Sequence, residues 1–407
     1  MTPELIIHIG AGKCGSSAIQ ESLSQCANRL EEQAILFHPV GVNHFDYATL
    51  LGRKTRGDDS KAFARAQKNI SEVRRAVASS KPDFVVFSAE NLFHVAPEKV
   101  LELLDTIVPG NPKVHIIGYI RDPADHYLSS VQQRLKGSFR ITPPQAYTAP
   151  IPGQLPGWKK NKRLASINVR HFSRQQLVNQ SVTSDFSDIL SSVTQRNVVL
   201  PEAKSNTSLS AEQMIVLQRF RRRVLHAHEG KLHILSGSLI RFFDELNKPR
   251  GTVKSHPQLK PGITTYIRRR NAERVRETEA LFPNLNLSKQ DELEKEEVDT
   301  QIKPEDSVAR LLAEWDSETV GIFESLVPQF AEAPGRRWFR CAMARLNLLM
   351  PSKEAKVAYE RFLIVSGYQH LIPRLRLIIA HQRFQAISPV QSVKRWMGRL
   401  KREQHVS

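Results

Sequence analysis

The first 32 residues of the chain contain a short apolar run, a glycine-rich turn and an amphipathic segment in direct succession. Residues 5–9 (Leu-Ile-Ile-His-Ile) have the composition of a buried parallel strand, and this run ends at Gly10. From about Ser16 to Glu32, apolar residues recur at helical spacing and predict a helix with one apolar face. A strand that passes through a glycine-rich turn into a helix is typical of a parallel α/β sheet.

Later apolar runs extend the same pattern. Residues 83–88, 114–120 and 167–172 are predicted strands, and an amphipathic helix is predicted over residues 97–108. Alternation of strands with helices predicts an α/β fold with a parallel sheet flanked by helices on both faces. Two further helices are predicted, over residues 210–223 and 265–282.

The composition changes along the chain and predicts three regions. The α/β domain is expected to span residues 1–288. It contains a Pro- and Gly-rich stretch at 142–160, which we expect to be an irregular loop: a lid, a binding loop or a disordered excursion. Residues 289–306 carry eight acidic side chains and predict a solvated linker. A basic helical C-terminal extension is predicted over residues 307–407.

The net charge of +18 is concentrated in that extension. Residues 334–402 hold fifteen basic and two acidic side chains, so this segment carries +13 and the remainder of the chain only +5. The excess indicates a solvated helical face, or contact with an acidic polymer or a membrane surface. Nucleic acid is not expected as a partner, because the charge lies away from the candidate sites described below.

The expected location is the cytoplasm. Cys14, Cys26 and Cys341 have no CxxC spacing, so neither a disulfide framework nor a zinc site is expected. The N-terminal residues lack the basic flank of a signal peptide, and no window approaches the ~18 apolar residues of a membrane span. Alternatively, the basic extension could attach the protein peripherally to the inner membrane surface.

The turn after the first strand, residues 10–17 (Gly-Ala-Gly-Lys-Cys-Gly-Ser-Ser), is the first candidate site. Backbone amides of such a turn and the N-terminus of the following helix suit a phosphate group. The turn is not a Walker A loop, because Lys13 precedes Gly15. Its Gly-x-Gly-x-x-Gly spacing fits a dinucleotide fingerprint, but no acidic partner for the ribose follows about 20 residues later. A lysine inside the turn and paired serines at the start of the helix suit a ligand with a terminal phosphoanhydride better than one with a bridging pyrophosphate.

The second candidate site follows the strand at 114–120. Arg121 ends that strand, Asp122 and Pro123 open a helix, and Ser129 lies two helical turns further on. A guanidinium and a hydroxyl at the ligand edge of a sheet make a second anion site. Glu90 follows the strand at 83–88 and is expected at the same edge.

Together these motifs resemble the sulfotransferases that depend on 3′-phosphoadenosine 5′-phosphosulfate (PAPS), in the bacterial branch that acts on carbohydrate-like acceptors. The first loop of that family typically has the sequence Pro-Lys-Thr-Gly-Thr-Thr, and residues 12–17 correspond to it, with Gly12 in place of the proline and Cys14 in place of a threonine. The family's arginine and the serine eight residues later correspond to Arg121 and Ser129. Segments at 169–172, 185–186 and 206–210 are also similar, so the resemblance covers residues 3–290.

The resemblance implies a P-loop-type sheet and in-line transfer of a sulfuryl group from PAPS to an acceptor hydroxyl on a glycan or glycolipid, with no metal required. It assigns the 5′-phosphosulfate to Gly12, Lys13, Cys14, Gly15, Ser16 and Ser17, and the 3′-phosphate to Arg121 and Ser129. Lys13 would neutralise charge on the bridging oxygen, and Glu90 would be the base, with His94 and His126 as alternatives.

Other interpretations fit parts of the sequence. A P-loop kinase would need an acidic metal ligand at a strand end, and a non-enzymatic polyanion-binding protein would act through the basic extension. The candidate residues also have structural interpretations. Ser16 and Ser17 could cap the helix, Arg121 could pair with Asp122 or Asp125, and Cys14 could be a small buried filler or an oxidisable thiol.

Overall fold

The computed structural model describes residues 2–39, 41, 43–44, 46–52, 59–151, 153–203, 208–233, 235–237, 239–240, 256–287 and 301–326. The chain divides into two compact units. The first comprises Met1–Ser130, Pro144–Asn206 and Pro261–Gln301, and the second comprises Val131–Pro143, Thr207–Lys260 and Ile302–Ser407. The basic segment at 334–402 and most of the acidic segment, residues 289–300, lie outside the described residues.

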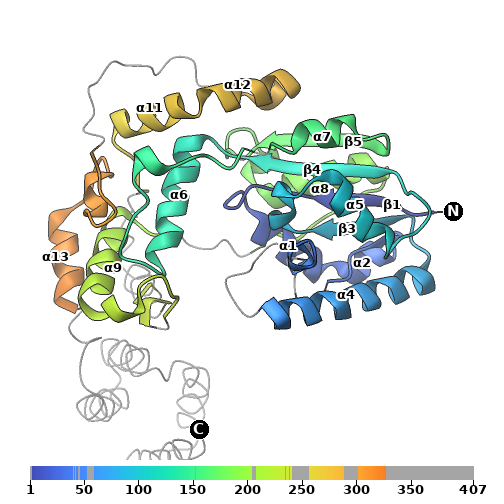
Figure 1. Cartoon of the computed structure of the whole chain (residues 1–407), viewed down its shortest axis with the longest axis horizontal. Coiled ribbons are helices and arrows are strands. Elements are labelled where there is room, and N and C mark those ends of the chain that lie inside the picture. The colour runs from blue at the N-terminus through green and yellow to red at the C-terminus, as the bar shows by residue number, and fades with distance from the viewer. Residues whose placement is uncertain are drawn as a thin grey trace, which may run out of the picture. The chain divides into compact units, whose positions relative to one another are not determined.

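The first unit contains a five-stranded parallel sheet with the strand order β2-β3-β1-β4-β5 (Figure 1). Its strands are β1 (Glu4–His8), β2 (Ile35–Leu36), β3 (Phe84–Ser88), β4 (Val114–Ile120) and β5 (Leu164–His171). The predicted parallel α/β sheet is confirmed, and four of its strands lie at or next to the expected positions. The sequence analysis missed β2, because two residues are too short to show any periodicity.

The helices of the first unit are α1 (Ser16–Gln25), α2 (Ala27–Glu31), α3 (Tyr47–Leu50), α4 (Asp59–Ser80), α5 (Pro97–Asp105), α6 (Pro123–Leu135, which continues into the second unit), α7 (Leu155–Lys160), α8 (Val182–Thr194), α11 (Pro261–Arg270) and α12 (Ala272–Leu281). The helix predicted over residues 16–32 is divided at Cys26, and the one predicted over 265–282 is divided at Asn271. The stretch at 142–160 is not wholly irregular, because it contains α7 and the 3-10 turn η2 (Pro144–Ala146).

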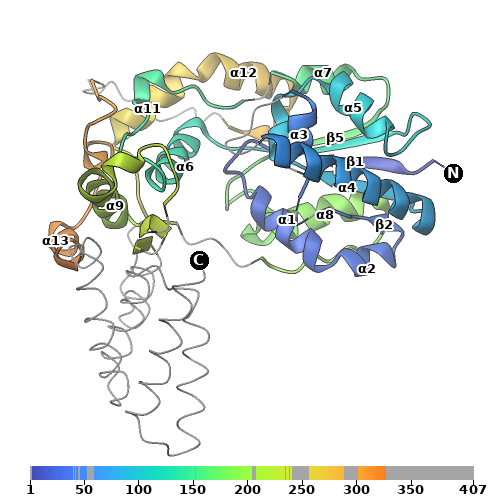
Figure 2. The ribbon, with the colours of Figure 1, turned by 60° about the horizontal axis from the view of Figure 1, so that its bottom comes forward.

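Helices cover both faces of the sheet. Figure 2 shows α1 and α8, which contact each other, on one face, and α5 and α7 on the other. The connection after β1 therefore runs on the face opposite to those after its neighbours β3 and β4. In open α/β sheets, ligands bind beyond the carboxyl ends of strands at such a change of direction. This geometry points to the carboxyl end of β1 as the place for a site.

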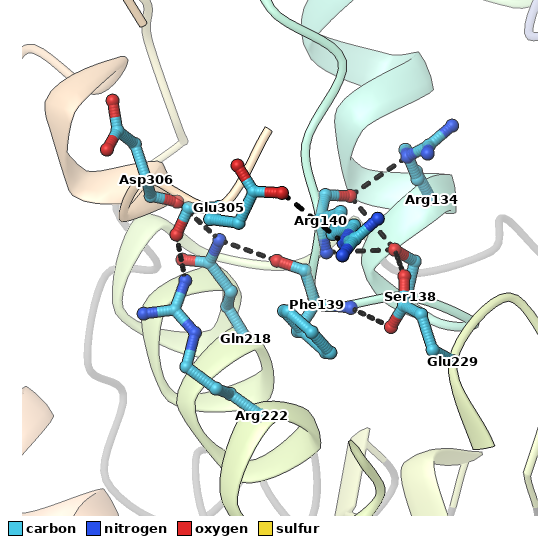
Figure 3. A network of polar contacts seen from close by, with 9 residues as sticks. All are labelled: Arg134, Ser138, Phe139, Arg140, Gln218, Arg222, Glu229, Glu305 and Asp306. Carbon is cyan, nitrogen blue, oxygen red and sulfur yellow. Dashed lines mark hydrogen bonds and ion pairs between the residues drawn. The ribbon is translucent and has the colours of Figure 1, made fainter. Parts of the chain in front are cut away.

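The second unit is organised around α9 (Ala211–Val224), which begins with a capping box formed by Ser210 and Gln213. Gln218 Nε2 of this helix donates to Phe139 O at 2.9 Å and to Asp306 O at 2.8 Å (Figure 3). Gln218 Oε1 accepts from Val308 N at 2.7 Å, so the whole amide is used. One buried side chain thus joins three chain segments of this unit. The remaining described elements here are the 3-10 turns η4 (His226–His228) and η6 (Val308–Arg310), and α13 (Ser317–Leu326).

The end of the acidic segment packs within this second unit. Ile302 is buried, Pro304 O accepts a hydrogen bond from Ile141 N at 2.8 Å, and Asp306 pairs with Arg310. The prediction of a solvated linker is therefore wrong for residues 301–306. The buried Ile302 side chain and the backbone hydrogen bond of Pro304 pack this segment against the rest of the unit. No helix in the described residues is both long and apolar enough to span a bilayer.

Two buried histidines, His8 and His44, contact Ser88, the last residue of β3. Ser88 N donates to His44 Nδ1 at 3.2 Å, and Ser88 Oγ lies 2.7 Å from His8 Nδ1. Burial lowers the pKa of each ring to about 3, so both imidazoles are neutral at physiological pH. Because Nδ1 of His44 accepts a hydrogen bond, its proton is on Nε2.

We expect His44 to make stability depend on pH. Its unfolded-state pKa is near 6.5 and its folded pKa is about 3, so below pH 6.5 only the unfolded state takes up a proton. The neutral His44 ring therefore makes its full contribution to the free energy of unfolding above pH 6.5. This contribution is lost as the pH falls toward the folded pKa. Between pH 7 and pH 5 this linkage is worth about 2 kcal/mol for one histidine. In urea denaturation at both pH values, His44→Asn should lose about 2 kcal/mol less than the wild type.

The substitution keeps an oxygen that accepts from Ser88 N, and His256→Asn, at an exposed position, is the control that should leave the loss unchanged. Equal losses for wild type and His44→Asn would contradict a neutral, buried His44.

Candidate functional site

The turn between β1 and α1, residues 10–17, is the centre of the candidate site, and the sheet positions it. Beyond the end of β1, Ile9 N donates to Ile117 O at 2.8 Å, and Ala11 N to Tyr119 O at 3.2 Å. The chain therefore stays paired with β4 up to Ala11. On the other side, Ala89 N donates to His8 O at 3.2 Å. The turn consequently lies between the residues that follow β3 and those that follow β4, as the sequence analysis expected for Glu90 and Arg121.

The turn has a constrained backbone. Lys13 has φ of 69° and Gly15 has φ of 78°, both in the left-handed region. A lysine there costs about 1 kcal/mol or more. At Gly15 a Cβ atom would lie 2.8 Å from the Phe172 ring and 2.9 Å from a Val182 methyl group. Gly15 is therefore required both by its φ and by close packing, whereas Gly12 has nothing within 4 Å of such an atom.

The serines at the start of α1 do not cap it. The N-cap residue is Gly15, with no side-chain capping bond, and Ser16 Oγ has no hydrogen-bond partner although Ser16 is only 3% exposed. Ser17 is exposed. The interpretation of Ser16 and Ser17 as capping residues is therefore wrong. A buried hydroxyl without a partner, beside the free amides of a helix N-terminus, fits an oxyanion in this turn.

Arg121 approaches the turn from the end of β4. Its Nη1 donates to Lys13 O at 3.4 Å, and its guanidinium lies 5.6 Å from the centre of the Phe172 ring. Asp122 does not pair with it. Asp122 Oδ1 accepts from the amides of Ala124 and Asp125 at the start of α6, and Oδ2 accepts from Arg268 Nε at 2.9 Å. The interpretation of Arg121 as an ion pair with Asp122 is wrong, because Arg268 occupies the remaining carboxylate oxygen. Among the described residues, no ion pair joins Arg121 to Asp125 either.

Cys14 points into the protein. Its side chain is fully buried, Sγ lies 3.9 Å from Gly12 O, and burial raises the thiol pKa to about 12. An oxidisable thiol with a lowered pKa is therefore excluded, and the small buried filler is the correct reading. Any contact with a ligand in the turn would come from the backbone amide of Cys14. Arg121 lowers this thiol pKa and Glu90 raises it, which places both charges near Cys14.

His126 connects the turn to Tyr147 through hydrogen bonds of both ring nitrogens. Its Nε2 lies 2.8 Å from Gly12 O and its Nδ1 lies 2.7 Å from the Tyr147 hydroxyl. A carbonyl oxygen only accepts, so Nε2 carries the proton. Burial lowers the pKa of His126 to about 4, so Nδ1 has no proton and accepts from Tyr147. Because both ring nitrogens are used, the alternative of His126 as the base is not supported by this geometry.

Tyr147 belongs to a segment that we name the strap, residues 144–151, within the Pro- and Gly-rich stretch. Side chains at the junction of α11 and α12 hold the strap by its backbone. Arg270 Nε donates to Tyr147 O at 3.2 Å, Asn271 Oδ1 accepts from Ala149 N at 2.9 Å, and Arg274 donates to Ala149 O at 3.1 Å. At the division between the two helices, the buried Asn271 amide is therefore available to accept a hydrogen bond from the strap.

The other candidate residues lie on the segments that follow β3 and β4. Glu90 begins the 3-10 turn η1 (Glu90–His94) directly after β3 and is half-buried, while His94 is exposed. Ser129 is half-buried on α6, one helical turn from His126. The sequence analysis missed Tyr147 and Arg268, for which no local pattern exists. It noted His8 only as part of an apolar run, where one polar residue in a buried strand was the available signal.

Within the described residues, no cluster of three or more His, Cys, Asp or Glu side chains is arranged to hold a metal ion. A scan of the chain against protein-family models finds no match, and a search of curated proteins finds no relative at a significant level.

Gly15→Ala should destabilise the protein by about 2–4 kcal/mol, because it adds both a left-handed Cβ and overpacking. Gly12→Ala is the matched control in the same turn, and we expect it to change the free energy of unfolding by no more than about 0.5 kcal/mol. Chemical denaturation measures both. Similar losses in the two variants would show that Gly15 is not uniquely constrained.

Tyr147→Phe should remove about 1 kcal/mol of stability by deleting the hydrogen bond to His126. It should also speed amide hydrogen exchange in the turn at residues 10–17, because Gly12 O then has a less fixed partner. Tyr47→Phe is the control, since the Tyr47 hydroxyl is buried without a partner and its removal should cost nothing. Unchanged exchange in Tyr147→Phe would argue that the strap does not hold the turn.

Proposed function

We propose that this protein is a PAPS-dependent sulfotransferase with a P-loop-type sheet. The observation that carries the proposal is the turn at residues 10–17, where the buried Ser16 hydroxyl has no hydrogen-bond partner beside the N-terminus of α1. Lys13 belongs to the same turn. Arg121 lies beside this turn and supplies a separate cation for a second phosphate. Two adjacent anion sites at one sheet edge suit a nucleotide that carries phosphates at both its 3′ and 5′ positions.

In this proposal the turn binds the 5′-phosphosulfate, and Arg121 with Ser129 binds the 3′-phosphate. Backbone amides at residues 12–17 and the dipole of α1 favour the negative charge without any protein group having to move. The strap and His126 contribute by fixing Gly12, so that the amides are arranged before the ligand arrives. Arg268 contributes by occupying Asp122, which leaves the Arg121 guanidinium available to an anion.

The bound donor would supply a sulfuryl group attached to phosphate through a bridging oxygen. Glu90 takes the proton of the acceptor hydroxyl as that oxygen forms its bond to sulfur and the bond from sulfur to the bridging oxygen breaks. Lys13 offsets the charge that develops on the bridging oxygen, and 3′,5′-ADP leaves. The acceptor is proposed to be a hydroxyl of a glycan or glycolipid.

Calorimetry with 3′,5′-ADP and 5′-AMP tests the nucleotide assignment. The wild type should bind 3′,5′-ADP more tightly, because only this ligand carries the 3′-phosphate. Arg121→Ala should weaken 3′,5′-ADP about tenfold or more and leave 5′-AMP nearly unchanged. Arg75→Ala, at an exposed position on α4, is the control that should change neither affinity.

Transfer with radiolabelled PAPS separates binding from chemistry. Glu90→Gln should keep its affinity for 3′,5′-ADP and lose transfer to the acceptor. Tight binding of Mg·ATP with no binding of 3′,5′-ADP at high micromolar concentration would replace the sulfotransferase with a kinase.

A further inference from the structure

His8 is a buried polar side chain that the proposed mechanism does not use. It is the last residue of β1, has no exposed surface, and packs edge-on against the rings of Tyr119 and Phe186. Its Nδ1 is 2.7 Å from Ser88 Oγ, while its Nε2 has no hydrogen-bond partner. A buried polar atom left without a partner is destabilising, so its retention calls for an explanation.

The unpartnered nitrogen lies at the base of the turn. A Cβ atom built on Gly10 would be 3.5 Å from His8 Nε2 and 3.3 Å from Ser16 Oγ. The two unpartnered polar atoms therefore approach the same point beside Gly10, one from β1 and one from α1. Gly10 has no side chain to fill that point. An oxygen atom held beyond that point, at van der Waals distance from the Gly10 backbone, could accept from both groups.

The hydrogen-bond chemistry of His8 suits an anionic oxygen. Its ring is neutral at physiological pH, since burial lowers its pKa to about 3. When the Ser88 hydroxyl donates to Nδ1, the ring proton is on Nε2, and this nitrogen becomes a donor aimed at the turn. Together with the Ser16 hydroxyl it offers two donors in a site shielded from water, where hydrogen bonds to charge are strongest.

We propose that His8 Nε2–H and the Ser16 hydroxyl donate together to one oxygen of the 5′-phosphate in the turn, and that Ser88 positions His8 by selecting its tautomer. The identity of the anion rests on the proposed function, whereas the two donors follow from the geometry. Ser88 also precedes Glu90 by two residues, so the same contact connects the floor of the anion site to the chain segment that carries the proposed base.

Substitutions of His8 that preserve one ring nitrogen at a time test this role. His8→Gln can place an amide N–H near the position of Nε2, whereas His8→Asn keeps only the position of Nδ1 and its contact with Ser88. In calorimetry, His8→Asn should bind 3′,5′-ADP about tenfold to a hundredfold more weakly, and His8→Gln should recover most of that loss. Both should bind 3′-AMP, which lacks the 5′-phosphate, as the wild type does.

Ser88→Ala leaves His8 in place and removes the group that selects its tautomer, so it should weaken 3′,5′-ADP several-fold and spare 3′-AMP. A measurement on the unmodified protein guards against variants that fail to fold. With nitrogen-15-labelled histidine, NMR should detect a proton on His8 Nε2 that shifts when 3′,5′-ADP is added. An unprotonated Nε2 in the complex, or equal affinities for wild type and His8→Asn, would overturn the proposal. Absence of 3′,5′-ADP binding by the wild type would instead reject the proposed function.

Discussion

The parallel pairing of β1 with both β3 and β4 is the constraint on which the candidate site depends. Because β1 lies between these strands, the residues after all three strands emerge at one edge of the sheet. Backbone bonds continue to β4 as far as Ala11, so the turn opens only where Arg121 leaves β4 and Glu90 has just left β3. Without this register, one cation and one carboxylate from distant parts of the sequence would not share a site with the turn.

A second layer of contacts keeps the turn in place. Gly15 fits against Phe172 and Val182 only because it has no side chain, and Gly12 is held through His126 by Tyr147 of the strap. All of these groups are neutral, and the protons of His126 and Tyr147 are positioned by their hydrogen-bond partners. They fix the backbone amides without adding charge near a ligand, so the charge that an anion would meet comes from a few placed groups such as Lys13 and Arg121. The +13 of residues 334–402 is a separate property of the chain.

Much of this organisation could be predicted from local patterns. The apolar runs of β1, β3, β4 and β5 and the turn at residues 10–17 depend on neighbours a few residues away, which the sequence displays directly. β2 was missed because it is too short to show a pattern, and two other predictions failed because of contacts across long sequence distances. Asn271 divides an otherwise continuous helical pattern because its amide binds Ala149, and residues 301–306 pack through Ile302 despite their acidic composition.

The sequence by itself determined the alternation of strands and helices, the glycines and lysine of the turn, and the presence of Glu90, Arg121 and Ser129 after the appropriate strands. Only the tertiary structure decided which side chains meet. It directed Cys14 into the protein, paired Asp122 with Arg268 across 146 residues, and brought Tyr147 to His126. The physical reason is that secondary structure depends on short-range periodicity, whereas the burial and hydrogen-bond partners of a side chain depend on how distant elements pack.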